Sequence, residues 1–191
     1  MENQVLEIIK KRRSTRIFLD KPIENESIHT IIEAGCYAPS GYNRQPWFFV
    51  VISNKEILDK LSVETKQSLK LSNNEHLQEV GNNPNFHVFY NAPTAILVCG
   101  DESDSLYTSH CSVATQNMLL AAESLSIGSC WIGVINSFSL DKNNKKLIEE
   151  YKEKFKIPNN YKISHAIALG YRKNEIAKAS PRKENVYTII K

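Results

Sequence analysis

The chain has 191 residues, of which 41% are hydrophobic and 24% are charged. This length and composition are those of one ordinary globular domain over residues 1–191, with enough apolar residues to form a core without disulfides or metals. The net charge of +3 is too small for a dedicated nucleic-acid binder, whose basic excess is normally much larger. The longest apolar run, near residues 117–122, is too short to span a bilayer.

The cysteines and histidines do not fall into ligand-like groups. The four cysteines are widely spaced without a CxxC pair, and we interpret them as small buried hydrophobic residues. The five histidines never fall at metal-ligand spacing, so no metal is expected. The N-terminal Met-Glu-Asn-Gln does not resemble a signal peptide, and we expect a reduced, cytoplasmic protein with no membrane partner.

Hydrophobic periodicity predicts alternating helices and strands in the first half of the chain. The expected elements are helices over residues 2–12, 26–38 and 55–71 and a strand over residues 47–53. Pro39 ends the second helix, because a proline disfavours helical geometry in the residue before it. Residues 72–86 are polar and rich in asparagine, with Gly81 and Pro84, and we expect a mobile loop or lid there.

The second half continues the alternation. The expected elements are strands over residues 95–100, 130–134 and 165–170, a helix over residues 109–125, and a helix that follows Ser139 as its cap. The helix over 109–125 is apolar on nearly all sides, so we expect neighbours on every face, one of them a second copy of the chain. The tail after residue 170 is polar until Val186 and then apolar. This pattern fits either an α+β or an α/β fold.

Three cations surround a hydroxyl near the N-terminus, at Arg12, Arg13, Ser14 and Arg16. Guanidinium groups match phosphate oxygens bidentately and keep their charge, so we interpret this cluster as half of a site for a phosphorylated ligand. Two alternatives stay open. One is a solvated basic helix end that complements the helix dipole, and the other is a nucleic-acid or nuclear-localisation patch, since residues 10–13 are four consecutive cations.

The motif Pro-Ser-Gly-Tyr-Asn-Arg-Gln-Pro-Trp follows about 25 residues later. Pro39, Ser40 and Gly41 form a tight turn, which exposes backbone N–H groups and a hydroxyl to an anion or a sugar. The side chains of Asn43 and Gln45 donate and accept, as sugar hydroxyls and heterocycle edges require. An ordinary helix-to-strand connection is the alternative interpretation. The two segments together predict two halves of a site for a phosphorylated, planar ligand.

Further motifs follow these two in order: N-A-P at residues 91–93, A-T-Q-N-M-L-L-A-A-E at 114–123, G-S-C-W-I-G at 128–133, A-I-A-L-G-Y at 166–171 and P-R-K at 181–183. This ordered set, which runs almost from end to end of the chain, resembles the FMN-dependent nitroreductase family. The resemblance implies an α+β three-layer sandwich, in which a mixed, mostly antiparallel sheet is flanked by helices. It also implies an intertwined homodimer with two FMN sites at the subunit interface.

The resemblance also implies a set of FMN contacts: Arg12, Arg13, Ser14, Arg16, Pro39, Ser40, Gly41, Asn43, Gln45, Ile132, Gly133, Arg182 and Lys183. In this assignment Arg12 faces the phosphate, and Arg182 with Lys183 completes the phosphate site. Arg16 reaches the pyrimidine edge of the flavin. Residues 39–43 come from the other subunit and contact the ribityl chain and the ring.

The implied chemistry belongs to the cofactor, and no side chain is assigned as catalytic. The backbone N–H groups of Ile132 and Gly133 would face flavin N5 and O4, and the charge of Arg16 would favour the two-electron reduced flavin. The expected activity is a ping-pong transfer from NADH or NADPH to nitroaromatic, quinone or flavin-type acceptors. Because no GxGxxG motif is present, the nicotinamide is expected to bind only transiently.

Two other functions stay open: a divergent flavin enzyme of the same fold, acting as a dehydrogenase or dehalogenase of a small metabolite, and a non-enzymatic dimer that binds nucleic acid through residues 10–13. The chain also departs from the family pattern. Many members have a mid-chain asparagine and lysine at the flavin pyrimidine, but residues 72–90 contain no lysine. Ile132 stands where larger members carry a glutamate, and their substrate-pocket insertion is reduced to about residues 66–86.

Overall fold

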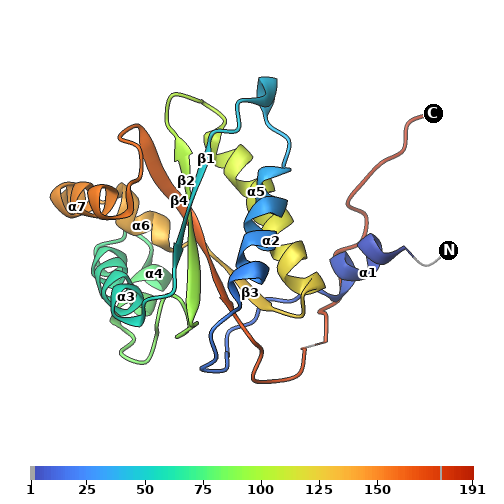
Figure 1. The fold of residues 1–191 in the computed structure, drawn as a ribbon, viewed down its shortest axis with the longest axis horizontal. Coiled ribbons are helices and arrows are strands. Elements are labelled where there is room, and N and C mark those ends of the chain that lie inside the picture. Colours follow the sequence, from blue (N-terminus) through green and yellow to red (C-terminus); the bar gives the residue numbers. More distant parts are fainter. Residues whose placement is uncertain (1–2, 177) are drawn as a thin grey trace.

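The computed structural model describes residues 3–176 and 178–191, which form a four-stranded sheet between two layers of helices (Figure 1). The strands are β1 (Trp47–Ile52), β2 (Thr94–Asp101), β3 (Gly128–Ile132) and β4 (Tyr161–Gly170). Their order is β1-β2-β4-β3, and each neighbouring pair is antiparallel. The predicted α+β sandwich is confirmed. Among the described residues, the expected mixed character is limited to one isolated parallel bridge, between Ser14 and Ser129.

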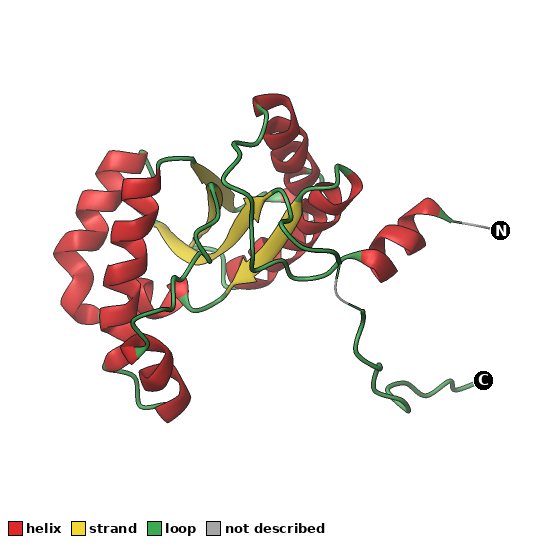
Figure 2. Ribbon diagram, turned by 90° about the horizontal axis from the view of Figure 1, so that it is seen from below, coloured by secondary structure: helices red, strands yellow, loops and turns green. Residues whose placement is uncertain are grey.

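The helices are α1 (Gln4–Lys11), α2 (Asn25–Cys36), α3 (Lys55–Lys70), α4 (Glu75–Asn82), α5 (Tyr107–Ser124), α6 (Ile135–Leu140) and α7 (Lys145–Phe155), with 3-10 turns η1 (Gly41–Asn43) and η2 (Lys142–Asn144). Helices α2 and α5 cover one face of the sheet, and α3, α4, α6 and α7 lie on the other (Figure 1). Figure 2 shows that α1 and the C-terminal arm leave the body of the molecule on the same side.

The central strand β2 explains why the sheet lies between two cores. Side chains alternate between the two faces of a strand, and every residue of β2 before Asp101 is buried. Leu97 belongs to a cluster with Phe138 on the side of α3 and α6, whereas Ile96 belongs to a cluster with Met118 on the side of α5. A strand that is apolar at successive positions is therefore covered on both faces.

The segment expected to be a mobile loop, residues 72–86, instead contains α4, so this prediction is wrong over Glu75–Asn82. The asparagines that suggested a loop include the helix cap, because the Asn74 side chain accepts a hydrogen bond from the Leu77 N–H at 3.3 Å. Gly81 then lets α4 lie directly against α3, since a Cβ at this position would come within 2.8 Å of the Lys70 nitrogen.

Two smaller expectations are also corrected. Ser139 does not cap the last helix: it lies buried within α6, and α7 begins only at Lys145. Among the cysteines Cys36 is exposed, and the other three are buried. On helix α5 Val113 is 40% exposed within one chain, so the expectation that a second copy covers one face of this helix stays a prediction.

Candidate functional site

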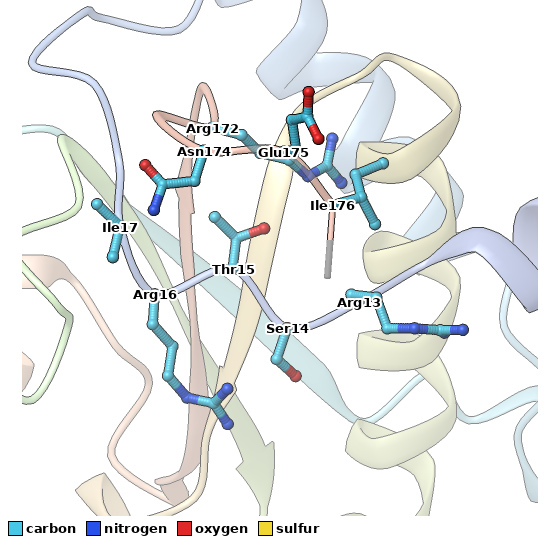
Figure 3. A pocket seen from close by; sticks show the side chains of 9 residues that line it. All are labelled: Arg13, Ser14, Thr15, Arg16, Ile17, Arg172, Asn174, Glu175 and Ile176. Atoms are coloured by element: carbon cyan, nitrogen blue, oxygen red, sulfur yellow. The ribbon is translucent and has the colours of Figure 1, made fainter. Parts of the chain in front are cut away.

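The basic segment that follows α1 runs in extended conformation along the edge of the sheet. The N–H of Thr15 donates to the carbonyl of Ser129 in β3 at 2.9 Å, and the N–H of Leu19 donates to the carbonyl of Tyr171 at 2.8 Å. Alternation along this extended segment sends neighbouring side chains to opposite sides. In Figure 3 the side chains of Ser14 and Arg16 point to one side, and that of Thr15 points to the other.

Two cavities flank this segment. The one in Figure 3 has a volume of about 170 Å³ and lies between the segment and residues 172–176. The other has a volume of about 280 Å³ and is called the basic cavity below. Its lining residues are Arg12, Arg13, Ser14, Arg16, Lys178, Ser180 and Arg182. Five of the sequence-predicted FMN contacts therefore meet here, including Arg182 from the far end of the chain.

The electrostatics of the basic cavity favour an anion. Five cationic and two hydroxyl side chains line it, and no carboxylate is among these described lining residues. The Nε of Arg13 is buried and has no hydrogen-bond partner in the described part of the chain. A buried donor without a partner is costly, so this set of donors matches a ligand that supplies several anionic oxygens.

Arg16 is held more tightly than its position in an exposed segment suggests. Its Nε donates to the Tyr90 hydroxyl at 3.3 Å, and this hydrogen bond raises the pKa of the guanidinium above its usual value. The guanidinium carbon also lies 5.7 Å from the centre of the Tyr90 ring. Burial raises the pKa of the nearby Cys130 thiol, and the charge of Arg16 acts in the opposite direction. Arg16 is therefore a fixed positive charge beside β3.

The end of β3 has open space beside its backbone. The side chain of Ile132 is buried, whereas Gly133 is exposed. A Cβ placed on Gly133 would come no nearer to a neighbouring group than 4.0 Å, at Trp131 Nε1. A planar group can therefore approach the main chain here without meeting a side chain.

The turn between α2 and β1 is held together by its own polar groups. The Ser40 hydroxyl accepts from the N–H of Gln45 at 2.9 Å, and the Gln45 side chain donates to Asn43 Oδ1 at 3.1 Å. The N–H of Gly41 donates to His110 Nε2 at 3.1 Å. His110 Nδ1 lies 3.2 Å from a carboxylate oxygen of Asp104. Helix α5, which carries His110, thus fixes the shape of this turn.

The two predicted halves of the site do not meet within one chain. Figure 1 shows η1 at the top of the molecule, whereas the segment after α1 lies lower, at the edge near β3. Lys183 is not among the residues that line the basic cavity.

Sequence reasoning missed Lys178 and Ser180 of the cavity and Tyr90 beneath Arg16. The first two carried a signal, since they lie in the same polar arm as Arg182, but Tyr90 is 74 positions from Arg16 and carried none.

Neither a metal centre nor a membrane span is found in the part of the chain that the structure describes. Within residues 3–176 and 178–191, no three His, Cys, Asp or Glu side chains are grouped so that they could hold a metal ion. None of the helices described in these ranges has both the length and the apolar character needed to cross a bilayer.

The structure thus defines a three-layer α+β protein with a cationic cavity beside its sheet. The chain belongs to the nitroreductase family, which matches residues 9–171. A protein of Archaeoglobus fulgidus, provisionally named an NADH dehydrogenase/NAD(P)H nitroreductase, is 35% identical over 177 residues, which are 90% of this chain and 87% of that protein.

Solved structures agree with this assignment. The crystal structure of a Bacteroides fragilis nitroreductase with bound FMN is similar over 100% of both chains, with a TM-score of 0.90 and 34% identity. A Desulfitobacterium hafniense nitroreductase with bound FMN is also similar over 100% of both chains, with a TM-score of 0.87 and 26% identity. The family resemblance predicted from the sequence is therefore confirmed.

Proposed function

We propose that this protein is an FMN-dependent oxidoreductase. It takes hydride from NADH or NADPH and passes electrons to nitroaromatic, quinone or flavin-type acceptors in alternating half-reactions. The basic cavity is the observation that carries this proposal, because its donors suit a phosphate and the segment that supplies most of them pairs with β3 through Ser14 and Ser129. Membership of the nitroreductase family supports it, as does the FMN bound to the two solved relatives.

The residues of the cavity fit FMN. Arg12 and Arg182, helped by Arg13, would hold the phosphate, while the hydroxyl of Ser14 supplies a neutral donor. Lys183 lies outside the lining of this cavity, so its predicted phosphate contact stays a prediction. Arg16 would face the pyrimidine edge, where its fixed charge stabilises negative charge. Bound FMN would supply hydride acceptance and donation at N5.

The chain's own part in the reaction is to hold and orient the flavin. The main chain of Ile132 and Gly133 would orient the ring without an ionisable side chain, and the missing Cβ of Gly133 leaves room for it. We assign no side chain as a catalytic acid, base or nucleophile.

We further propose that a second subunit completes the site. The basic cavity, at about 280 Å³, is slightly below the usual range for small-molecule sites. Residues 39–43 and Gln45 of the other subunit would supply the missing wall for the ribityl chain and ring. One subunit alone also leaves apolar side chains exposed to solvent, such as Val5 at 62% and Ile190 at 93% exposure. Such exposure is expected of a homodimer surface.

The test is to purify the protein, record its absorbance spectrum, and titrate it anaerobically with NADH and with NADPH before adding a panel of acceptors. We expect bound FMN that either nicotinamide bleaches and that an acceptor reoxidises. A protein that takes up no FMN would refute the proposal. Bound FMN that neither nicotinamide bleaches would instead favour a divergent flavin enzyme, such as a dehydrogenase or a dehalogenase.

A further inference from the structure

The turn that carries Tyr90 has an unusual backbone. Tyr90 and Asn91 have φ angles of 54° and 52°, in the left-handed region that residues with a Cβ rarely adopt. Hydrogen bonds within the turn join Tyr90 N–H to the His87 carbonyl at 2.8 Å and Ala92 N–H to the Phe89 carbonyl at 3.0 Å. Such a conformation persists only where surrounding contacts hold it.

The imidazole of His87 supplies those contacts. Its Nδ1 accepts hydrogen bonds from the backbone N–H groups of Phe89 at 3.1 Å and of Asn91 at 3.2 Å. A nitrogen that accepts two hydrogen bonds carries no proton, so the proton of the neutral ring is on Nε2. This atom lies 3.1 Å from Asp59 Oδ1 in α3, to which it donates. Asp59 thereby fixes the tautomer that the turn requires.

The neutral form of His87 is also the one that its surroundings favour. Only 16% of the side chain is exposed. Burial is the largest influence on the pKa of His87 and lowers it, and Lys55 and Lys66 act in the same direction. The hydrogen bond and charge of Asp59 raise the pKa, but the net shift is downward. The ring is therefore an acceptor at neutral pH.

The turn leads directly to the basic cavity. The Tyr90 hydroxyl accepts from Arg16 Nε at 3.3 Å, and the Phe86 ring packs edge-on against the Tyr90 ring at 5.8 Å. Arg16 has no other hydrogen bond among those described for its side chain, so Tyr90 sets the direction of the guanidinium. A loosened turn would release Tyr90 and, with it, Arg16.

We propose that His87 is a positioning residue for Arg16, which it orients through the strained turn and the Tyr90 hydroxyl. This inference rests on the proposed function, in which Arg16 faces the flavin. It adds that the electronic environment of the flavin depends on the His87 imidazole. This ring contacts Asp59 of α3 and does not itself line the basic cavity.

Two isosteric variants separate the roles of the ring nitrogens. His87→Asn keeps an acceptor near the position of Nδ1, whereas His87→Gln places its amide near Nε2 and loses the acceptor that holds the turn. We expect amide hydrogen exchange at Phe89 and Asn91 to speed up about two- to tenfold in His87→Gln, the range that the loss of one hydrogen bond produces. In His87→Asn these two rates stay near those of the wild type, and amides of β2 stay protected in both variants.

The same variants are then examined at Arg16. In the flavin-free protein we expect the Arg16 Nε–H NMR signal to lose its protection in His87→Gln and in Tyr90→Phe, but not in His87→Asn. In the FMN-bound protein, the midpoint potential should shift in the same direction in His87→Gln and Tyr90→Phe. Tyr90→Phe should leave exchange at Phe89 and Asn91 unchanged, because it removes only the hydroxyl.

Two results would overturn the inference: unchanged exchange at Phe89 and Asn91 in His87→Gln, or a loosened turn that leaves both the Arg16 signal and the potential at wild-type values. A wild-type protein that binds no FMN would refute the proposed function alone, because exchange and the Arg16 signal are read without flavin.

Discussion

At the residue scale, the arginines of the basic cavity differ in what holds them. Arg12 and Arg182 come from distant parts of the chain and meet only at the cavity. Arg16 is instead fixed by Tyr90. A cation with no strong protein partner is free to bind phosphate, whereas one that is already oriented acts mainly through its field. These neighbours give the residues separable roles.

We therefore predict that Arg12→Ala and Arg182→Ala each lower FMN affinity by about 1.5–3 kcal/mol, the worth of a charge-assisted hydrogen bond. Arg16→Ala should change the midpoint potential of the bound flavin more than its retention. Flavin fluorescence titration and dye-coupled redox titration measure the two quantities. Lys154→Ala, which removes an exposed cation on α7, is the control and should change neither. Equal effects of all three arginine variants would contradict the separate roles.

His165 makes the stability of the protein depend on pH. It lies buried in β4, with Nε2 2.7 Å from the Thr115 hydroxyl and Nδ1 3.0 Å from the Ser164 hydroxyl. Burial lowers its pKa from 6.5 to about 4. The unfolded chain therefore binds a proton at a higher pH than the folded one, and stability falls as the pH drops through this window.

We expect the free energy of unfolding to fall by up to about 3 kcal/mol between pH 6.5 and pH 4 through His165, since each pKa unit is worth about 1.4 kcal/mol. Urea unfolding of the wild type and of His165→Asn across this range tests the prediction, and the variant should show a flatter dependence. His76→Asn, at an exposed histidine, should keep the wild-type slope. If the His165 variant also keeps that slope, the assignment is wrong.

At the scale of elements, close backbone contact decides whether residues 72–86 are a helix or a loop. Helix α4 is short, and Gly81 is its only buried residue. A Cβ at Gly81 would lie 2.8 Å from the Lys70 nitrogen and 2.9 Å from the Lys66 carbonyl oxygen of α3. These are main-chain atoms, which cannot rotate away as the end of a side chain can.

Gly81→Ala should therefore lower the free energy of unfolding by about 1–3 kcal/mol, the usual cost of overpacking. Helix propensity alone predicts the opposite sign, because alanine favours a helix more than glycine does. Chemical denaturation gives the magnitude, and faster limited proteolysis within residues 72–86 would locate the effect. Asn82→Ala introduces the same side chain at the next, exposed position and should not destabilise. If Gly81→Ala instead stabilised the protein, the prediction would be wrong, because the α3 backbone would then move to accommodate the Cβ.

At the scale of the whole molecule, the separation of the two predicted half-sites is the main structural result. Within one chain the basic segment and η1 lie apart (Figure 1), and η1 is held in place by His110 of α5. Our proposal unites them between two copies of the chain. Their separation within one chain supports the proposed homodimer.

Subunit complementation tests the shared site. Arg12→Ala damages one half-site, and Gly41→Glu damages the other, since its Cβ would meet only the His110 ring at 3.7 Å and the chain should still fold. In a heterodimer of the two variants, one site carries both defects and the other carries none. We expect one FMN per heterodimer at a concentration that saturates the wild type but neither variant homodimer. A heterodimer without FMN would show that each site is built from a single chain.

The order of helices and strands was largely predictable from the sequence, because side-chain periodicity depends on local backbone geometry. Residues 47–52 and 94–101 form strands close to where their β-branched and aromatic runs predicted them. The asparagine-rich residues 72–86 were wrongly predicted to be a loop, because their composition does not reveal the contact between Gly81 and α3. Propensity is a local quantity, and tertiary packing overrode it there.

The sequence by itself determined the family and, through the family resemblance, the α+β class. Its guanidinium, hydroxyl and glycine groups in a fixed order also predict a site for a phosphorylated ligand. Only the tertiary structure decided which of these residues meet. It placed Arg182 and Arg12 in the lining of one cavity and the Tyr90 hydroxyl within hydrogen-bond distance of Arg16. It also kept residues 39–45 apart from this cavity. Spatial neighbours that are separated by many residues are chosen by sheet register and packing, which no local pattern encodes.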